Sequence, residues 1–162
     1  MSTALFPGSF DPLHNGHIDI VEIASRCFDS VVIAAIRNPG KAAGLFSLAE
    51  REDMIMESLG HLGNVRVVAM KTLTVTVARD EGADVIVKGL RVASDFEFEL
   101  QQAQMNKAIS DGGIQTLFIP CGSSNSFIAS SLVRQIAQLG GVDRVEQFVP
   151  QPVFQRLKEK FA

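Results

Sequence analysis

Apolar residues along this chain form two alternating patterns, short continuous runs and longer segments in which they recur every three or four positions. The continuous runs, several of them rich in β-branched residues, are typical of strands that are buried on both faces. They predict strands at residues 4–6, 30–36, 64–70, 84–88 and 115–119. The spaced segments predict helices at about residues 20–28, 47–59, 74–81, 94–110 and 130–139, and two short helices in the tail separated around Pro150 and Pro152.

Local signals mark several helix ends. Ser47 and Glu50 have the spacing of a capping box, as do Ser94 and Glu97, so a helix is predicted to begin at each place. The segment Asp111–Gly113 predicts the end of the helix that precedes it.

Strand and helix patterns alternate five times, an order that favours one parallel sheet with right-handed crossovers and helices on both faces. The sequence therefore predicts an α/β fold, a single doubly wound domain over residues 1–162 with a five-stranded parallel sheet and a helical C-terminal tail. Ligands in such folds bind beyond the carboxyl ends of the strands, where the strand order reverses. The loops that leave those ends are predicted at residues 7–16, 37–46, 71–74, 88–93 and 120–129.

Composition narrows the class of protein. Of the 162 residues, 46% are hydrophobic and 20% are charged, which is typical of a globular chain, and no apolar run is long enough for a membrane helix. Fifteen basic and eighteen acidic residues give a net charge of −3, which argues against a general nucleic-acid-binding protein. Cys27, on the predicted apolar helix face, and Cys121 lack metal or redox spacing and are expected to be reduced thiols. Because no secretory signal pattern is seen, we expect a cytoplasmic protein.

The most informative stretch runs from Phe6 to Asp19, with the sequence Phe-Pro-Gly-Ser-Phe-Asp-Pro-Leu-His-Asn-Gly-His-Ile-Asp. It joins the first predicted strand to the first predicted helix. Pro7 and Pro12 fit neither a continuing strand ladder nor a helix interior, and Gly8 and Gly16 permit close approaches that other residues resist. The unpaired N–H groups at the start of the following helix point at this loop, so an anion placed there would meet several donors.

His14 and His17 in this stretch allow three interpretations. They could ligate a metal, although no third ligand or orienting partner is apparent nearby. They could be an ordinary turn histidine and helix-cap histidine. In the third interpretation an imidazole N–H donates to a phosphoryl oxygen, Gly16 leaves room for that oxygen, and Ser9 adds its hydroxyl or backbone N–H.

These motifs resemble a known group of enzymes. Pro7-Gly-Ser-Phe-Asp-Pro with His14-Asn-Gly-His17 is similar to the H-x-G-H nucleotidyltransferase superfamily, and the resemblance to the bacterial phosphopantetheine adenylyltransferase family extends over the whole chain. Further matching positions are Lys41, Lys88-Gly-Leu-Arg91, Asp95-Phe-Glu-Phe-Glu99, Met105-Asn106 and Ser126-Phe-Ile-Ala-Ser-Ser-Leu132. The resemblance implies a Rossmann-like nucleotidyltransferase fold.

The activity that this resemblance implies is adenylyl transfer from ATP to 4′-phosphopantetheine, which gives dephospho-coenzyme A and pyrophosphate in the penultimate step of coenzyme A biosynthesis. The expected cofactor is Mg²⁺, held mainly by ATP phosphates and water rather than by protein ligands. The expected assembly is a homohexamer, with neither nucleic acid nor membrane as a partner.

The resemblance also implies roles for individual residues. His17 would stabilise the transition state, and Lys41 and Arg91 would neutralise the reacting phosphates. The implied ATP-binding set is Ser9, Phe10, His17, Gly89, Leu90, Arg91, Glu99, Asn125, Ser126, Phe127, Ile128, Ala129, Ser130 and Ser131. The implied 4′-phosphopantetheine set is Ser9, Lys41, Thr74 and Lys88. Without the resemblance, Lys41 would be interpreted as a solvated loop lysine and Glu99 equally well as a helix-surface carboxylate.

The chain departs from the common family pattern at three positions. Lys88 stands where many members have arginine, Ala129 replaces the first serine of a triple-serine run, and Asn125 stands where an aromatic residue could flank the adenine. The alternatives are an adenylyltransferase of the same superfamily that acts on nicotinamide mononucleotide, a metal-dependent hydrolase that uses His14 and His17, and a nucleotide sensor without catalysis.

Overall fold

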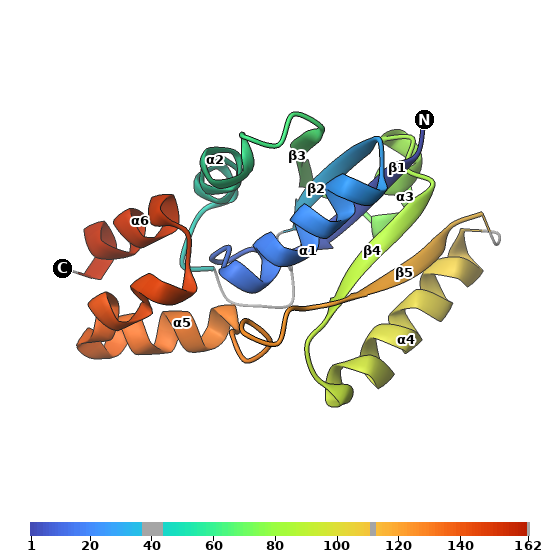
Figure 1. Cartoon of the computed structure of the whole chain (residues 1–162). Helices are drawn as coiled ribbons and strands as arrows, with labels where there is room; N and C mark the ends of the chain where they lie inside the picture. Colours follow the sequence, from blue (N-terminus) through green and yellow to red (C-terminus); the bar gives the residue numbers. More distant parts are fainter. Residues whose placement is uncertain (37–43, 111–112, 162) are drawn as a thin grey trace.

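The computed structural model describes residues 1–36, 44–110 and 113–161, in which five strands form one all-parallel sheet (Figure 1). The strands are β1 (Thr3–Gly8), β2 (Ser30–Ile36), β3 (Val65–Met70), β4 (Val85–Leu90) and β5 (Gln115–Pro120). Their order across the sheet is β3-β2-β1-β4-β5. The chain therefore starts in the middle of the sheet, adds two strands on one side and then two on the other, which confirms the predicted doubly wound α/β fold.

The described residues form six α-helices, of which the first four cover the two faces of this sheet. They are α1 (Asn15–Cys27), α2 (Leu48–Leu59), α3 (Thr74–Asp80), α4 (Ala93–Ile109), α5 (Ser130–Ile136) and α6 (Gln151–Phe161). A π-helical segment (Ala137–Gly141) and a 3-10 helix (Val142–Phe148) connect α5 to α6. Helices α1 and α2 pack on one face, and α3 and α4 lie on the other. Beyond the sheet edge, α6 packs against α2 and extends the core of the first face.

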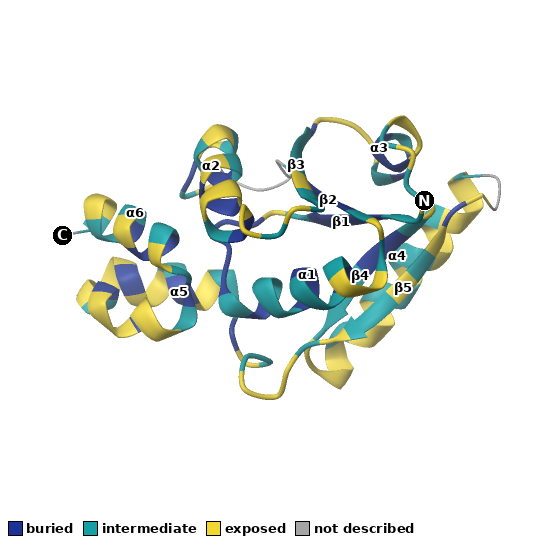
Figure 2. Ribbon diagram, turned by 45° about the horizontal axis from the view of Figure 1, so that its top comes forward, coloured by how far each residue is buried: buried dark blue, intermediate teal, exposed yellow. Residues whose placement is uncertain are grey.

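The middle positions of β1 and β2 are apolar and buried because both faces of these strands are covered. Ala4 and Phe6 of β1 belong to the larger core beside α1 and α2, whereas Leu5 between them belongs to the smaller core beside α3. Figure 2 shows β1 and β2 largely in the buried colour, and α4 largely in the exposed and intermediate colours. No residue of α4 is buried, so this helix is the least covered of the long helices.

The start of α4 corrects the sequence prediction. Gly89 and Leu90, predicted to be loop, continue β4 because they pair with β5. Only two residues then lead to α4, whose N-cap is Val92 with no side-chain capping bond. The predicted capping box of Ser94 and Glu97 is therefore wrong, since both residues lie within the helix. Its predicted end at 111–113 falls partly on residues 111–112, outside those described.

Three other predictions fared differently. The capping box at the start of α2 is confirmed, because the Ser47 N–H donates to Glu50 Oε2 at 2.7 Å and the Glu50 N–H donates to Ser47 Oγ at 3.2 Å. The two short tail helices are confirmed, as Val142–Phe148 and α6, and Pro150 lies between them. Pro152 lies in the first turn of α6, where proline is tolerated. Cys27 is exposed rather than on the apolar face of α1, where Ile20, Val21 and Ala24 are buried instead.

Across the described parts of the chain, none of the helices combines the length and apolar character needed to span a bilayer.

Candidate active site

The candidate site lies where β1 and β4 are neighbours. The connection from β1 leads through α1 to one side of the sheet, and that from β4 leads through α4 to the other side, so their loops diverge beyond the strand ends. Such a divergence leaves an opening at the carboxyl edge of a parallel sheet. The segment after Gly8 and the segment after Leu90 therefore border the same opening. The sequence predicted a ligand site at these loops.

His17 stands in the first turn of α1 with its ring held on two sides. The His14 backbone N–H donates to His17 Nδ1 at 3.2 Å. A neutral imidazole has one donor and one acceptor nitrogen, so the proton of His17 lies on Nε2. The His14 and His17 rings stack at a centroid distance of 3.7 Å, and the Phe10 ring meets His17 edge-on at 5.0 Å. The site therefore presents an oriented Nε2–H donor.

Both imidazoles are neutral at pH 7. Burial, together with the nearby Arg91 guanidinium, lowers the pKa of His14 from 6.5 to about 4. Burial also holds the pKa of His17 well below 6.5, with further lowering by His14 and Arg91. His14 Nδ1 is buried without a hydrogen-bond partner among the described residues. Neutral, oriented imidazoles favour hydrogen bonding to a phosphate oxygen over ion pairing.

These pKa shifts predict a pH dependence of stability. Between pH 6.5 and 4 the unfolded chain binds a proton at residue 14 that the folded chain does not, so the free energy of unfolding falls as the pH is lowered. We expect the His14 contribution to be about 1 kcal/mol between pH 7.5 and 5.5. Urea unfolding at both pH values would measure the loss, and His14→Gln should reduce it while the exposed His61→Gln should not. An equal loss in the His14 variant would contradict this assignment.

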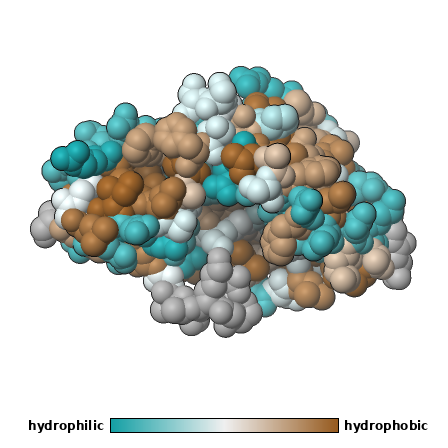
Figure 3. Space-filling view, turned by 90° about the horizontal axis from the view of Figure 1, so that it is seen from below, coloured by the Kyte–Doolittle hydropathy of each residue, from teal (hydrophilic) through white to brown (hydrophobic). Residues whose placement is uncertain are grey.

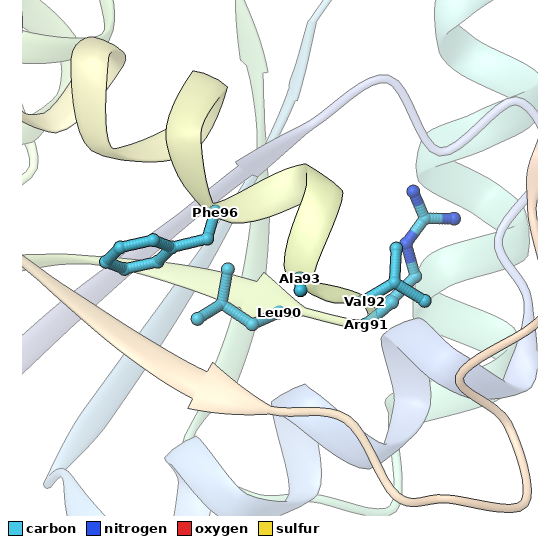
Figure 4. A pocket seen from close by; sticks show the side chains of 5 residues that line it. All are labelled: Leu90, Arg91, Val92, Ala93 and Phe96. Carbon is cyan, nitrogen blue, oxygen red and sulfur yellow. The ribbon is translucent and has the colours of Figure 1, made fainter.

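Arg91 joins the β4–α4 connection to the loop before α5. Its Nη1 donates to the Ile128 carbonyl at 3.0 Å, and its Nε contacts Asp95 Oδ2 at 3.2 Å. Figure 4 shows the guanidinium directed away from Phe96, at the far side of an open hollow of about 320 Å³ that both residues line. The positive charge of Arg91 contributes to the lowered pKa values of both His14 and His17.

The loop before α5 approaches α1 closely. A Cβ on Gly16 would lie 3.1 Å from the His14 ring and 3.2 Å from the Asn125 carbonyl oxygen, so glycine at this position permits the contact. Asn125 Nδ2 donates to Asp19 Oδ2 at 2.9 Å. The Asn125 side chain is therefore held by a hydrogen bond to α1.

Helix α5 begins at Ser130, as predicted, but no serine caps it. The N-cap is Ala129, without a side-chain capping bond, and Ser130 Oγ instead donates to the Pro12 carbonyl at 2.9 Å. Ser126 Oγ donates to the Ser123 carbonyl at 3.2 Å. The first N–H groups of α5 thus remain without a side-chain cap. Of the remaining predicted positions in this loop, Ile128 is buried, whereas Phe127 and Ser131 are exposed.

Lys88 and Glu99 contact each other across β4 and α4. Lys88 Nζ lies 3.3 Å from Glu99 Oε2 and 3.3 Å from Gln102 Oε1, and both charged side chains are about one-fifth exposed. Glu99 is therefore neither a free surface carboxylate nor remote from the other predicted residues. Two positions that the family resemblance assigns to different substrates form one ion pair.

The remaining predicted residues lie in different parts of the fold. Ser9 and Phe10 follow β1, and Gly89 and Leu90 end β4, so all four lie at the carboxyl edge of the sheet, although the Phe10 side chain is buried in the core. Thr74 is the first residue of α3, on the face of the sheet that α4 also covers. Lys41 lies outside the described residues.

Sequence reasoning missed a buried polar group behind the loop after β1. Asp11 and Arg51 are 6% and 5% exposed, and Arg51 Nε lies 3.4 Å from Asp11 Oδ1. The Arg134 side chain, on α5, also contacts both the backbone carbonyl and the carboxylate of Asp11. The signal was present, since an aspartate between Phe10 and Pro12 in a buried turn requires a partner, but the sequence does not show which arginine supplies it.

Within residues 1–36, 44–110 and 113–161, no group of three or more histidine, cysteine or carboxylate side chains is arranged to hold a metal ion. His17 Nδ1 already accepts the His14 N–H. The arrangement at this site is one of hydrogen-bond donors and positive charge.

Comparisons with known proteins show which family the chain resembles. The chain matches the cytidylyltransferase-like family over residues 5–136. It is 49% identical over 158 residues to a phosphopantetheine adenylyltransferase of Synechococcus sp. strain JA-3-3Ab, with 98% of this chain and 97% of the relative covered. It is also 49% identical over 159 residues to the phosphopantetheine adenylyltransferase of Gloeobacter violaceus, with 98% and 96% covered.

A similar solved structure is a Vibrio parahaemolyticus protein provisionally assigned as a nicotinate-nucleotide adenylyltransferase. Its TM-score is 0.68, it is 19% identical, and the match covers 98% of this chain and 99% of that one. At this identity the similarity shows the fold alone.

Proposed function

This chain belongs to the phosphopantetheine adenylyltransferases within the cytidylyltransferase-like family, and we propose that it transfers the adenylyl group of ATP to 4′-phosphopantetheine, giving dephospho-coenzyme A and pyrophosphate. It is a nucleotidyltransferase. The observation that carries the proposal is identity near 49% over almost the full length of relatives with that name.

The chemistry fits the donors at the carboxyl edge of the sheet. A phosphate oxygen of the acceptor attacks the α-phosphorus of ATP, a P–O bond forms, and the bond from that phosphorus to the oxygen shared with the β-phosphate breaks to release pyrophosphate. This reaction needs in-line placement of the two substrates and donors for the oxygens that gain negative charge. The His17 Nε2–H and the Arg91 guanidinium are suited to that role, and the uncapped start of α5 supplies further N–H groups.

The two substrates would meet beside the Lys88–Glu99 pair. In this proposal Glu99 contacts the ribose of ATP, and Lys88 contacts the phosphate of the acceptor, with Thr74 near the pantetheine arm. Lys88 keeps the positive charge of the more common arginine but lacks its planar fork, so it binds phosphate as a point charge. The acceptor phosphate would replace part of the Glu99 contact at Lys88. Ser9 and Lys41 complete the proposed acceptor site.

The proposed cofactor is Mg²⁺ carried by the phosphates of ATP. The two carboxylates flanking the histidine motif are already occupied, because Asp11 accepts protein N–H groups and Asp19 accepts from Asn125. Because Asp11 and Asp19 are engaged in this way, we expect the ion to keep its phosphate and water ligands rather than bind these carboxylates. Such an ion would neutralise charge on the phosphate oxygens.

Pyrophosphate release with a panel of acceptors tests the proposed function. With ATP and Mg²⁺ the protein should release pyrophosphate with 4′-phosphopantetheine, and much more slowly with nicotinamide mononucleotide, nicotinate mononucleotide or no acceptor. Mass spectrometry should identify dephospho-coenzyme A as the second product. Activity with a pyridine mononucleotide alone would overturn the proposal, and ATP binding without pyrophosphate release from any acceptor would indicate a sensor.

We also propose a homohexamer, which is the assembly that the family resemblance implies, and the uncovered apolar side chains of α4 supply a surface on which subunits could associate. The exposed apolar residues of this helix are Phe96, Phe98, Met105 and Ile109. Figure 3, in which the molecule is seen from below relative to Figure 1, shows several apolar areas on the surface. Apolar areas of this kind often mark interfaces. Light scattering should give a mass of about six times the 17.5 kDa chain, and a monomer at micromolar concentration would contradict the proposal.

A further inference from the structure

We propose that the buried Asp11–Arg51 pair is a positioning pair, which holds Phe10 and, through its ring, the His17 imidazole in the geometry needed for adenylyl transfer. This inference rests on the proposed function. In this proposal neither Asp11 nor Arg51 contacts a substrate. Both act indirectly, by holding Phe10, whose ring contacts the catalytic residue His17.

The first step of the argument is the backbone of Phe10. This residue has a φ of 46°, in the left-handed region that residues other than glycine rarely adopt. Such a conformation persists only where its surroundings impose it, and it is often found at active sites. The loop after β1 therefore needs an external restraint to keep its shape.

Arg51 and Asp11 supply that restraint on both sides of Phe10. Arg51 Nη1 donates to the Ser9 carbonyl at 3.0 Å, immediately before Phe10. The carboxylate of Asp11, immediately after Phe10, contacts Arg51 Nε at 3.4 Å. One guanidinium thus contacts both neighbours of the strained residue.

The pair is itself anchored to two other parts of the fold. Arg51 also donates to the Phe46 carbonyl at 2.9 Å and to the Ile36 carbonyl at 3.3 Å. Asp11 accepts the N–H groups of Leu45 and Phe46, each at 2.9 Å. The loop after β1 is therefore fixed relative to the end of β2 and the start of α2.

The side chain of Phe10 transmits this restraint to His17. Its ring is 1% exposed and meets the His17 ring edge-on at 5.0 Å and the Phe6 ring at 5.4 Å. A Cβ on Gly8 would lie only 2.8 Å from the Phe10 ring, so the ring has no free space on that side. A shift of the Phe10 backbone would move the ring against His17 and turn the Nε2–H donor. Displacements of about 1 Å at a catalytic group can cost 10²-fold in rate.

The test is Arg51→Lys, which keeps the charge but cannot donate to three carbonyl groups from one planar fork. We expect kcat for pyrophosphate release to fall between 10-fold and 100-fold, while the Kd for ATP changes less than about three-fold, because the lost geometry matters most in the transition state. The matched control is Arg156→Lys, which alters an exposed arginine–carboxylate pair with Glu57 and should leave kcat unchanged.

A double-mutant cycle with His17 separates positioning from a general loss of structure. In a His17→Ala background, followed with radiolabelled ATP, Arg51→Lys should lower the residual kcat by less than about three-fold, because the group that it positions is gone. The same loss in both backgrounds, or a folded Arg51→Lys protein with wild-type kcat, would overturn the inference. If that variant is too unstable to assay, Asp11→Asn carries the same test, since the amide keeps one acceptor oxygen and the shape of the side chain. Wild-type protein that releases no pyrophosphate would instead refute the proposed function.

Discussion

Replacing His17 by alanine is expected to lower kcat for pyrophosphate release by about 10²–10³-fold, the usual cost of removing one oriented donor to a developing negative charge. The Kd for ATP should change little, because the contact strengthens as the α-phosphate oxygens gain charge. Nδ1 of the ring is fixed by the His14 N–H, so Nε2–H is the donor that the substitution removes. Steady-state kinetics and equilibrium binding of ATP would measure the two effects separately.

His61→Ala is the matched control, because His61 is exposed between α2 and β3, away from the opening at the carboxyl edge. It should leave kcat within two-fold of the wild type, given the usual small effect of surface substitutions. If His17→Ala retained wild-type kcat, the H-x-G-H element would have no direct part in the reaction. A loss confined to the Kd for ATP would make His17 a ground-state binding residue only.

The second large effect is expected for Arg91→Ala, with a loss of about 100-fold in kcat/KM for ATP, or ~2.7 kcal/mol of transition-state stabilisation. Two consequences combine in this variant. A positive charge beside both histidines is lost, and the Ile128 carbonyl loses the donor that ties the loop before α5 to β4.

Arg91→Lys distinguishes those consequences. This variant restores the positive charge but not the planar guanidinium group. It should recover part of kcat/KM if most of the loss comes from the missing charge, and little if most comes from the missing hydrogen bond to Ile128. Arg79→Ala, at an exposed position on α3, should behave as the wild type. Wild-type kcat/KM in Arg91→Ala would remove this arginine from the proposed site.

Local patterns predicted the fold well where one signal decided the outcome. The run Ser30–Ile36 is β2 to the residue, and the capping box at Ser47 starts α2. The predicted start of α4 was wrong because Gly89 and Leu90 pair with β5 and so extend β4. The local sequence does not show which strands pair. The exposure of Cys27 was likewise missed, since it depends on where the last turn of α1 ends relative to the sheet.

The candidate site was predictable in outline but not in its contacts. The histidine motif and the switch in strand order both point to the loops after β1 and β4, and the structure places His17 after β1 and Arg91 after β4, which are neighbouring strands. The partners of Lys88 and Asp11 could not be predicted. Each contact joins residues at least eleven positions apart, so it depends on how the elements pack.

Helix α4, in which no residue is buried, should open more easily than the covered helices α1 and α2. Its amide hydrogens would then exchange with solvent sooner than those of the covered helices α1 and α2. Because Lys88 on β4 reaches Glu99 and Gln102 on α4, any ligand gripped between that strand and the helix would slow this exchange. Deuterium uptake along this one helix would thus report ligand binding without any reaction taking place.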